Sequence, residues 1–201
     1  MERLGEAGVD EALLIARSQQ GDTDAFNRLV AQYHRQVFNL AYRMLGDRAA
    51  AEDATQETFL SAFQKLGSFR AGNFRAWLLR IAVNACRDYL RSGHHRKTLS
   101  LEGLAEEDPT TPFPSNDEAP EDYALRRELR DAIAQGLKTL PPDQRLAILL
   151  VDVQGLSYEE AAQVMGVPMG TVKSRLSRAR LAMRSYLLAH KELLPASLRF
   201  L

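Results

Sequence analysis

Apolar side chains recur three and four residues apart along most of this 201-residue chain. From Phe26 to Met44 they follow the i, i+3, i+4, i+7 spacing of an amphipathic helix, and Gly46 follows as a helix stop. The same spacing predicts further helices over residues 48–66, 74–91, 123–140, 143–153, 157–165 and 169–188. Gly67 and Gly93 are expected to close the first two of these. No run alternates with period two, as a half-buried strand would, so the sequence predicts an all-α fold.

A segment rich in acid and proline interrupts the helical pattern. Residues 98–122 hold four of the eight prolines, and residues 98–125 hold eight acidic residues and no lysine or arginine. Such a composition cannot bury enough apolar surface to fold alone. We therefore expect two small helical domains joined by a flexible linker. The expected boundaries are 10–93 for the first domain, 94–121 for the linker, 122–188 for the second domain and 189–201 for a C-terminal tail.

Charge is segregated along the chain although the totals balance, with 26 Lys plus Arg against 26 Asp plus Glu. Residues 70–97 carry seven basic residues and one acid, and residues 173–184 carry five basic residues and no acid. Two basic blocks that flank an acidic one favour nucleic acid as a partner, and this segregation matters more for partners than the net charge of zero.

Several classes of protein are excluded by what the sequence lacks. A single cysteine, Cys86, rules out a disulfide framework and a Cys-based zinc site. No P-loop, glycine-rich dinucleotide turn or H-E-x-x-H motif occurs, so we expect no enzyme, no cofactor, no metal and no small-molecule substrate. No apolar run approaches the roughly 20 residues of a membrane span, and the N-terminus has no secretory stretch. We expect a cytoplasmic protein without direct membrane insertion.

The most informative stretch lies towards the C-terminus and fits a helix-turn-helix. Ser157 and Glu160 have the spacing of a capping box at the start of one helix, and Gly166 can take the left-handed turn at its end. Pro168 suits the first turn of the next helix, whereas Thr171 is an alternative N-cap three residues later. The expected core face of this second helix consists of Val172, Leu176, Ala179 and Met183.

The other face of this second helix carries side chains that suit DNA. The candidate contacts are Thr171, Lys173, Ser174, Arg175, Ser177 and Arg178. Serine and arginine can meet base edges, and Lys173 suits a phosphate. Arg175 lies nearer the core edge and fits either a phosphate contact or a buttress to a neighbouring acid. A solvated basic helix in a bundle is the competing interpretation, and it leaves the coincidence of cap, turn glycine and core stripe unexplained.

A second basic stripe lies on the helix predicted to begin at Phe74. The expected apolar face of this helix consists of Phe74, Leu78, Ile81, Ala85 and Tyr89. The basic stripe consists of Arg80, Asn84, Arg87 and Arg91, at i, i+4, i+7 and i+11. Three guanidinium groups on one stripe repel one another unless anions neutralise them, and DNA would do so, with Asn84 as a bidentate base contact. A solvated face partly paired to Asp88 explains the pattern equally well.

The loop before this helix contains two glycines and an aromatic residue beside a cation. Phe69, next to Arg70 and shortly before Asn73, fits two roles. Either its ring holds an unstacked base, or it fills the core, which is the commoner role for phenylalanine. Trp77 is expected in the core.

The helix over residues 48–66 carries an acidic stripe at i, i+3, i+4 and i+7. The stripe consists of Asp53, Gln56, Glu57 and Leu60. One apolar residue among acids is typical of a protein-docking surface rather than of a DNA-binding surface. A solvated helix face has the same periodicity and about equal weight.

Four stretches of the sequence resemble one protein family. They are A-E-D-A-T-Q-E-T-F at 51–59, F-R-A-W-L-L-R-I-A-V-N at 74–84, L-S-Y-E-E-A-A at 156–162 and P-M-G-T-V-K-S-R-L-S-R-A-R at 168–180. In this order and spacing the chain resembles the extracytoplasmic-function (ECF, group IV) sigma factors of the bacterial sigma-70 family. The resemblance covers residues 10–188, and the four motifs together are specific where each alone is moderate.

The resemblance implies a sigma factor that binds core RNA polymerase and directs transcription initiation at promoters, in a stress or envelope response. Residues 10–93 would be sigma domain two, and residues 122–188 would be sigma domain four. The acidic stripe would dock on the clamp helices of the largest polymerase subunit, and the flap region would be a second contact. The protein would be nucleoid-associated when in holoenzyme, and an anti-sigma factor would be its regulatory partner.

The resemblance also implies how promoter DNA would be read. The loop from Phe69 to Asn73 would capture a flipped base as the −10 element melts, and the basic stripe would face −10 DNA. The helix-turn-helix would read the −35 element in the major groove. The two elements lie roughly 50 Å apart, whereas a free coil of residues 94–120 spans about 30 Å and reaches about 90 Å when stretched. Polymerase would therefore have to hold the linker extended. The net charge of zero also predicts that the free chain binds DNA weakly.

A protein of a different class is the alternative. It is a stand-alone helix-turn-helix transcription regulator whose N-terminal domain senses a ligand or oligomerises. This alternative predicts tight binding to a palindromic site in the absence of polymerase.

Overall fold

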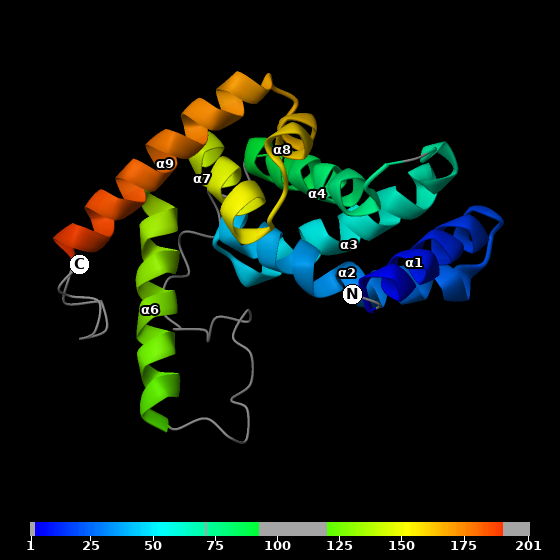
Figure 1. Cartoon of the computed structure of the whole chain (residues 1–201), viewed down its shortest axis with the longest axis horizontal. Helices are drawn as coiled ribbons and strands as arrows, with labels where there is room; N and C mark the ends of the chain where they lie inside the picture. Colours follow the sequence, from blue (N-terminus) through cyan, green and yellow to red (C-terminus); the bar gives the residue numbers. More distant parts are fainter. Residues whose placement is uncertain (1–2, 71, 93–119, 191–201) are drawn as a thin grey trace. The chain divides into compact units, whose positions relative to one another are not determined.

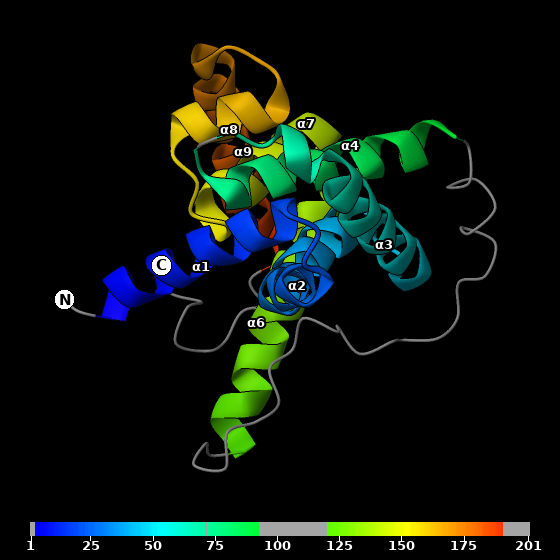
Figure 2. The ribbon, with the colours of Figure 1, turned by 90° about the vertical axis from the view of Figure 1, so that its right-hand side faces the viewer.

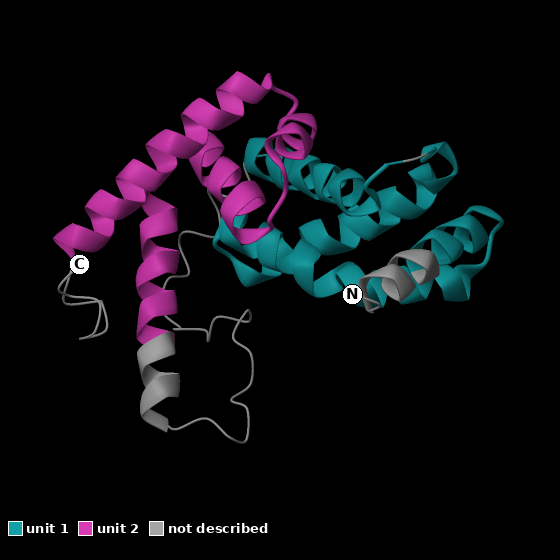
Figure 3. Ribbon diagram, viewed as in Figure 1, with its two compact units in different colours: residues 1–100 teal, residues 101–201 magenta. Residues whose placement is uncertain are grey.

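The computed structural model describes residues 3–70, 72–92 and 120–190, with side chains over 11–70, 72–92 and 127–190. The chain divides into two compact units, one within residues 1–100 and one within residues 101–201 (Figure 3). The described residues contain no strand, which confirms the all-α prediction. The expected linker lies outside the described residues except for residues 120 and 121, which begin a helix, and the tail lies outside them from residue 191 onward.

The first unit is built around one long helix. Its α-helices are α1 (Arg3–Gln19), α2 (Thr23–Leu45), α3 (Arg48–Lys65) and α4 (Phe74–Arg91), and a short 3-10 helix, η1 (Leu66–Ser68), follows α3 (Figure 1). Helix α2, which Figure 2 views nearly along its axis, contacts α1, α3 and α4. Its residues Leu29, Val37 and Leu40 are at most 1% exposed. Burial of each such side chain stabilises the fold by about 1.5–3 kcal/mol.

Short polar side chains fix where three of these helices begin. The side chain of Asp22 accepts from the Ala25 N–H at 3.0 Å, that of Asp47 from Ala50 at 2.7 Å, and that of Asn73 from Ala76 at 3.1 Å. These are N-caps, which satisfy backbone donors that have no partner within the helix. The predicted stop at Gly46 is confirmed, because this residue adopts φ 76° and closes α2.

The buried face of α4 differs from the prediction. Phe74 and Leu78 are buried as expected, but Ile81, Ala85 and Tyr89 are half-buried. The remaining buried residues are Ala76, Leu79, Ala82, Val83 and Cys86. Helix α4 packs against both α2 and α3, so its buried face is wider than one stripe and is turned from the predicted one. Cys86 is fully buried, and this burial raises the pKa of its thiol to about 12.

The second unit is built on its last helix. It contains α6 (Pro120–Thr139), α7 (Pro142–Ile148), a π-helix, η2 (Leu149–Val153), α8 (Tyr158–Met165) and α9 (Met169–Ala189). Helix α9 contacts α6, α7 and α8. The predicted single helix over residues 143–153 is therefore an α-helix followed by a π-helical turn. Arg145 donates to the carbonyls of Lys138 and Leu140 at 2.7 and 3.2 Å, which satisfies acceptors at the end of α6.

Candidate protein and nucleic-acid interfaces

The acidic stripe lies on the exposed face of α3. Its members Asp53, Gln56, Glu57 and Leu60 are all exposed, and Leu60 keeps 53% of its surface accessible. The opposite face is buried through small residues such as Ala51 and Thr58. Among the described residues, Asp53 and Glu57 form no ion pair, although a Glu57 oxygen accepts from the Ser61 hydroxyl at 3.0 Å. The stripe therefore presents two carboxylates and one apolar side chain to a partner.

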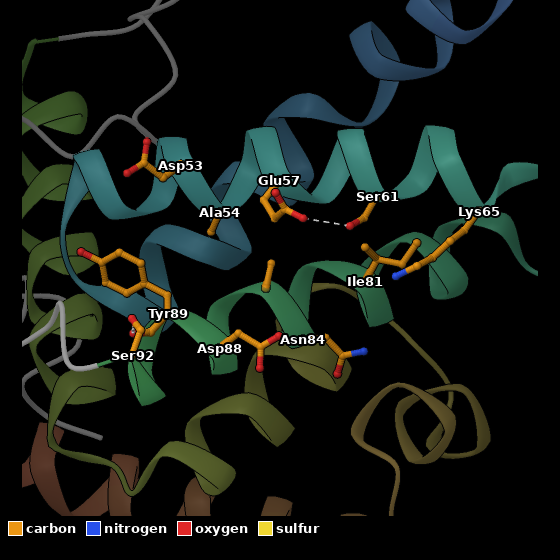
Figure 4. A pocket seen from close by; sticks show the side chains of 11 residues that line it. Asp53, Ala54, Glu57, Ser61, Lys65, Ile81, Asn84, Asp88, Tyr89 and Ser92 are labelled. Carbon is orange, nitrogen blue, oxygen red and sulfur yellow. Dashed lines mark hydrogen bonds between the residues drawn. The ribbon is translucent and has the colours of Figure 1, made fainter.

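Grooves run along both sides of α3. The groove between α3 and α4 is lined by Asp53 and Glu57 on one side and by Asn84, Asp88 and Tyr89 on the other (Figure 4). The groove between α2 and α3 is largely apolar, and its lining includes Phe26, Val30, Phe59, Leu60 and Phe63. The structure thus brings Asn84, a predicted DNA contact, into the same groove as the predicted docking carboxylates.

The basic stripe on α4 is largely exposed. Arg80, Asn84 and Arg91 are exposed, and Arg87 is half-buried. Arg91 pairs with Asp88 at 3.4 Å, as the solvated-face interpretation expects. Both side chains of this pair are about three-quarters exposed, and pairs of this kind contribute little to stability. The arginine can therefore exchange Asp88 for a phosphate at low cost.

Phe69 packs beside two other aromatic rings and is only partly covered by them. It is half-buried, and its ring centroid lies 5.5 Å from that of Phe74 and 5.3 Å from that of Trp77. Trp77, expected in the core, is itself half-buried. Of the other loop candidates, Arg70 is exposed and Asn73 caps α4. Packing against Phe74 and Trp77 leaves part of the Phe69 ring accessible beside the exposed Arg70.

The helix-turn-helix has the predicted capping box, left-handed turn and core face. The Ser157 N–H donates to Glu160 at 2.8 Å, and the Glu160 N–H donates back to the Ser157 hydroxyl at 3.1 Å. Gly166 adopts φ 70° between α8 and α9, where a residue with a Cβ would be strained. Helix α9 begins at Met169 with Pro168 as its N-cap, so Thr171 is not the cap. The predicted core stripe is confirmed, since Val172, Leu176, Ala179 and Met183 are all buried.

The face of α9 opposite this stripe is exposed and basic. Lys173, Ser174, Ser177 and Arg178 are exposed, whereas Thr171 and Arg175 are half-buried. Lys173 lies over the ring of Tyr158 on α8, with its ammonium 5.5 Å from the ring centroid, which holds the charge near the turn. Within the described residues Arg178 forms no ion pair.

Two arginines of α9 are held by acids on the preceding elements. Arg175 pairs with Asp143 of α7 at 2.6 Å, which is the buttress role that the sequence left open. Arg180 pairs with Asp152 of η2 through two contacts of 2.9 and 2.6 Å, and these bonds raise the pKa of Arg180 above its ordinary value. Sequence reasoning missed both acids. The position of Arg175 at the core edge was a signal for the first of them.

The described residues contain no group of three or more His, Cys, Asp or Glu side chains arranged to hold a metal ion. None of the described helices is long and apolar enough to cross a membrane.

Family models and known structures match both units. Sigma-70 region 2 matches residues 29–96, and Sigma-70, region 4 matches residues 130–183. The chain is 37% identical over 179 residues to the ECF RNA polymerase sigma factor SigE of Mycolicibacterium smegmatis, covering 89% of this chain and 68% of that protein. It is 38% identical over 179 residues to the ECF RNA polymerase sigma-E factor of Escherichia coli strain K12, covering 85% and 90%.

Solved structures agree with these relatives. CnrH, in complex with the cytosolic domain of CnrY, matches with a TM-score of 0.65 and 30% identity, covering 90% of this chain and 99% of that chain. The sigma factor RpoE, in complex with the anti-sigma factor NepR from Bartonella quintana, matches with a TM-score of 0.61 and 29% identity, covering 81% and 96%. The stand-alone regulator is not favoured, because the N-terminal unit matches a sigma region rather than a sensing domain. The chain belongs to the ECF RNA polymerase sigma factors.

Proposed function

We propose that this sigma factor docks on the clamp helices of the largest polymerase subunit through the acidic stripe of α3. The observation that carries the proposal is that unit 1 exposes the acidic stripe of α3 and the basic stripe of α4 on neighbouring helices. Two carboxylates without ion pairs attract a basic partner, and the exposed Leu60 supplies apolar contact. The basic stripe of α4 is then available to bind DNA.

In this proposal the −10 element lies against α4 and the loop before it. Arg80, Arg87 and Arg91 meet phosphates, Asn84 meets a base edge, and Phe69, Arg70 and Asn73 border a pocket for a flipped base. The exposure of Arg80 and Arg91 supports phosphate contacts. The half-exposed ring of Phe69 beside Arg70 supports stacking of an unpaired base.

The −35 element is read by α9. Lys173 contacts a phosphate, and Thr171, Ser174, Ser177 and Arg178 lie on the side that faces the major groove. Arg175 and Arg180 hold the helix to Asp143 and Asp152 and so position it rather than read DNA. Residues 130–183 match a sigma region 4 model, which supports this assignment.

The remaining parts of the proposal follow from the family. The flap region of polymerase is a second contact for the C-terminal unit, and the protein works in the cytoplasm, nucleoid-associated when in holoenzyme. An anti-sigma factor is the regulatory partner, a role supported by the structure of RpoE in complex with the anti-sigma factor NepR from Bartonella quintana. The protein contributes binding energy rather than catalysis, in a stress or envelope response.

Transcription with reconstituted holoenzyme tests the docking surface. Asp53→Ala removes one carboxylate of the stripe, and we expect it to weaken binding to core polymerase by about tenfold or more. Asp24→Ala is the matched control, because Asp24 is an exposed acid on α2, outside the stripe, that forms no ion pair within the described residues. Affinity for core enzyme and run-off transcript yield are the measurements. Equal loss in both variants, or a wild-type chain that starts no transcript with core enzyme, contradicts the proposal.

A further inference from the structure

The last residue of α1 holds the loop that leads into α4. The side-chain nitrogen of Gln19 donates to the carbonyl of Leu66 at 3.0 Å and to the carbonyl of Phe69 at 2.7 Å. A primary amide has two N–H groups, so both donors of this side chain are used. The Phe69 N–H also donates to the Leu66 carbonyl at 3.0 Å. Gln19 therefore spans the turn and fixes the backbone at both of its ends.

Gln19 is itself held in place. Within the turn from α1 to α2, Arg17 pairs with Asp22 at 2.6 Å, and the Asp22 N–H donates to the Arg17 carbonyl at 3.1 Å. The buried Ser18 hydroxyl donates to the Leu14 carbonyl at 2.6 Å. The end of α1 is thus bonded to α2 and to its own preceding turn, so Gln19 can act as a fixed brace.

The brace acts at the residue proposed to capture a base. Phe69 packs against Phe74 and Trp77 with part of its ring exposed. A ring stacks more strongly on an unpaired base where its backbone is already in position, because ordering the backbone during capture would consume binding energy. Resting on the proposed role of this loop, we infer that Gln19 is a positioning residue for base capture at the −10 element.

A paired substitution separates this role from a general one. Gln19→Met keeps the length and helix propensity of the side chain and removes both donors. Gln20→Met is the matched control, because Gln20 is the adjacent exposed glutamine and makes no side-chain bond within the described residues. Holoenzymes carrying each variant are compared on an intact promoter and on one with an abasic site at the captured position. That position is located beforehand with 2-aminopurine, whose fluorescence rises when the base leaves the stack.

The intact and abasic promoters, each combined with wild-type and with Gln19→Met holoenzyme, form a double-mutant cycle. We expect Gln19→Met to slow open-complex formation about fivefold on the intact promoter, to reduce the 2-aminopurine signal, and to have no effect on the abasic promoter. Gln20→Met should match wild type on both. An equal loss on both templates, or no loss on either, overturns the inference while leaving the sigma function intact. Absence of open complexes with wild-type holoenzyme instead overturns the proposed function, and the inference falls with it.

Discussion

At the scale of single residues, the carboxylate of Asp22 has two interaction partners. It accepts the Ala25 N–H as the cap of α2 and also pairs with Arg17. The backbone hydrogen bond from Ala25, and then the bond from Arg17, lower the pKa of this carboxyl below its ordinary value. A group whose pKa is lower in the folded state stabilises the protein above its unfolded pKa, and this stability is lost as pH falls through the folded pKa.

Asp22→Asn tests this linkage. Asparagine keeps the capping oxygen but cannot titrate. We expect wild type to be the more stable protein near neutral pH and the difference in free energy of unfolding to shrink below about pH 4. Urea denaturation at a series of pH values measures it. Curves that stay parallel down to acid pH would show that the carboxylate has no such role.

Residue-level roles could be predicted where they depend on helical periodicity alone. The exposure of Asp53, Glu57 and Arg178 follows from their place on a wheel, and so does the burial of Leu176. Partners on other elements could not be predicted in this way. The acid that holds Arg175 is 32 positions away in sequence, and its position depends on how α7 packs on α9.

At the scale of secondary-structure elements, helix α6 passes very close to side chains of α9. A Cβ built on Gly136 would lie 2.8 Å from the ring of Tyr186 and 2.9 Å from the end of Met183. The small residue in α6 is therefore what allows the two helices to pack at this distance, at the expense of helix propensity.

Gly136→Ala should destabilise the second unit. The overlap costs about 1–3 kcal/mol, and the gain in helix propensity offsets at most about 1 kcal/mol. We expect a net loss of about 1 kcal/mol in the free energy of unfolding. Gly170→Ala is the control, since nothing lies within 4 Å of the added carbon, and it should be neutral or stabilising. Thermal unfolding of the two variants decides the point, and an unchanged or higher midpoint for Gly136→Ala would refute it.

The elements with regular apolar spacing and polar caps could be predicted closely. Helices α3, α4 and α8 begin within a residue of the expected positions because Asp47, Asn73 and Ser157 cap them. Helix α1 was missed because Leu13, Leu14 and Ile15 are consecutive and because polar residues, the buried Ser18 and the half-buried Glu11, lie on its packed face. The π-helical turn at η2, which carries the Asp152 that pairs with Arg180 of α9, was also missed, since apolar spacing does not distinguish a π-turn from an α-turn.

At the scale of the whole molecule, two separately folded units must act on one promoter. The segment that we propose as a tether between them, residues 94–120, is 27 residues long and ends at the first residue of α6. We propose that the reach of this segment, rather than its affinity for a partner, sets the promoter spacing that the chain can serve.

Shortening the tether tests this limit. Deleting residues 100–115 leaves 11 of the 27 residues, which span about 37 Å when fully stretched, short of the roughly 50 Å required. We expect run-off transcription from a two-element promoter to be lost while binding to core polymerase persists. Replacing the same 16 residues with glycine and serine keeps the reach and should retain initiation. Full activity of the shortened protein would exclude a spanning role.

The burial of Cys86 has a practical consequence for measuring that span. Its sulfur has no access to solvent and the thiolate is strongly disfavoured, so maleimide dyes will not label the native protein there. Because the chain has no other cysteine, thiols introduced at exposed sites on the two units would be modified selectively without first removing the native one. Energy transfer between donor and acceptor fluorophores could then follow, in an otherwise wild-type background, how far the units separate as holoenzyme assembles.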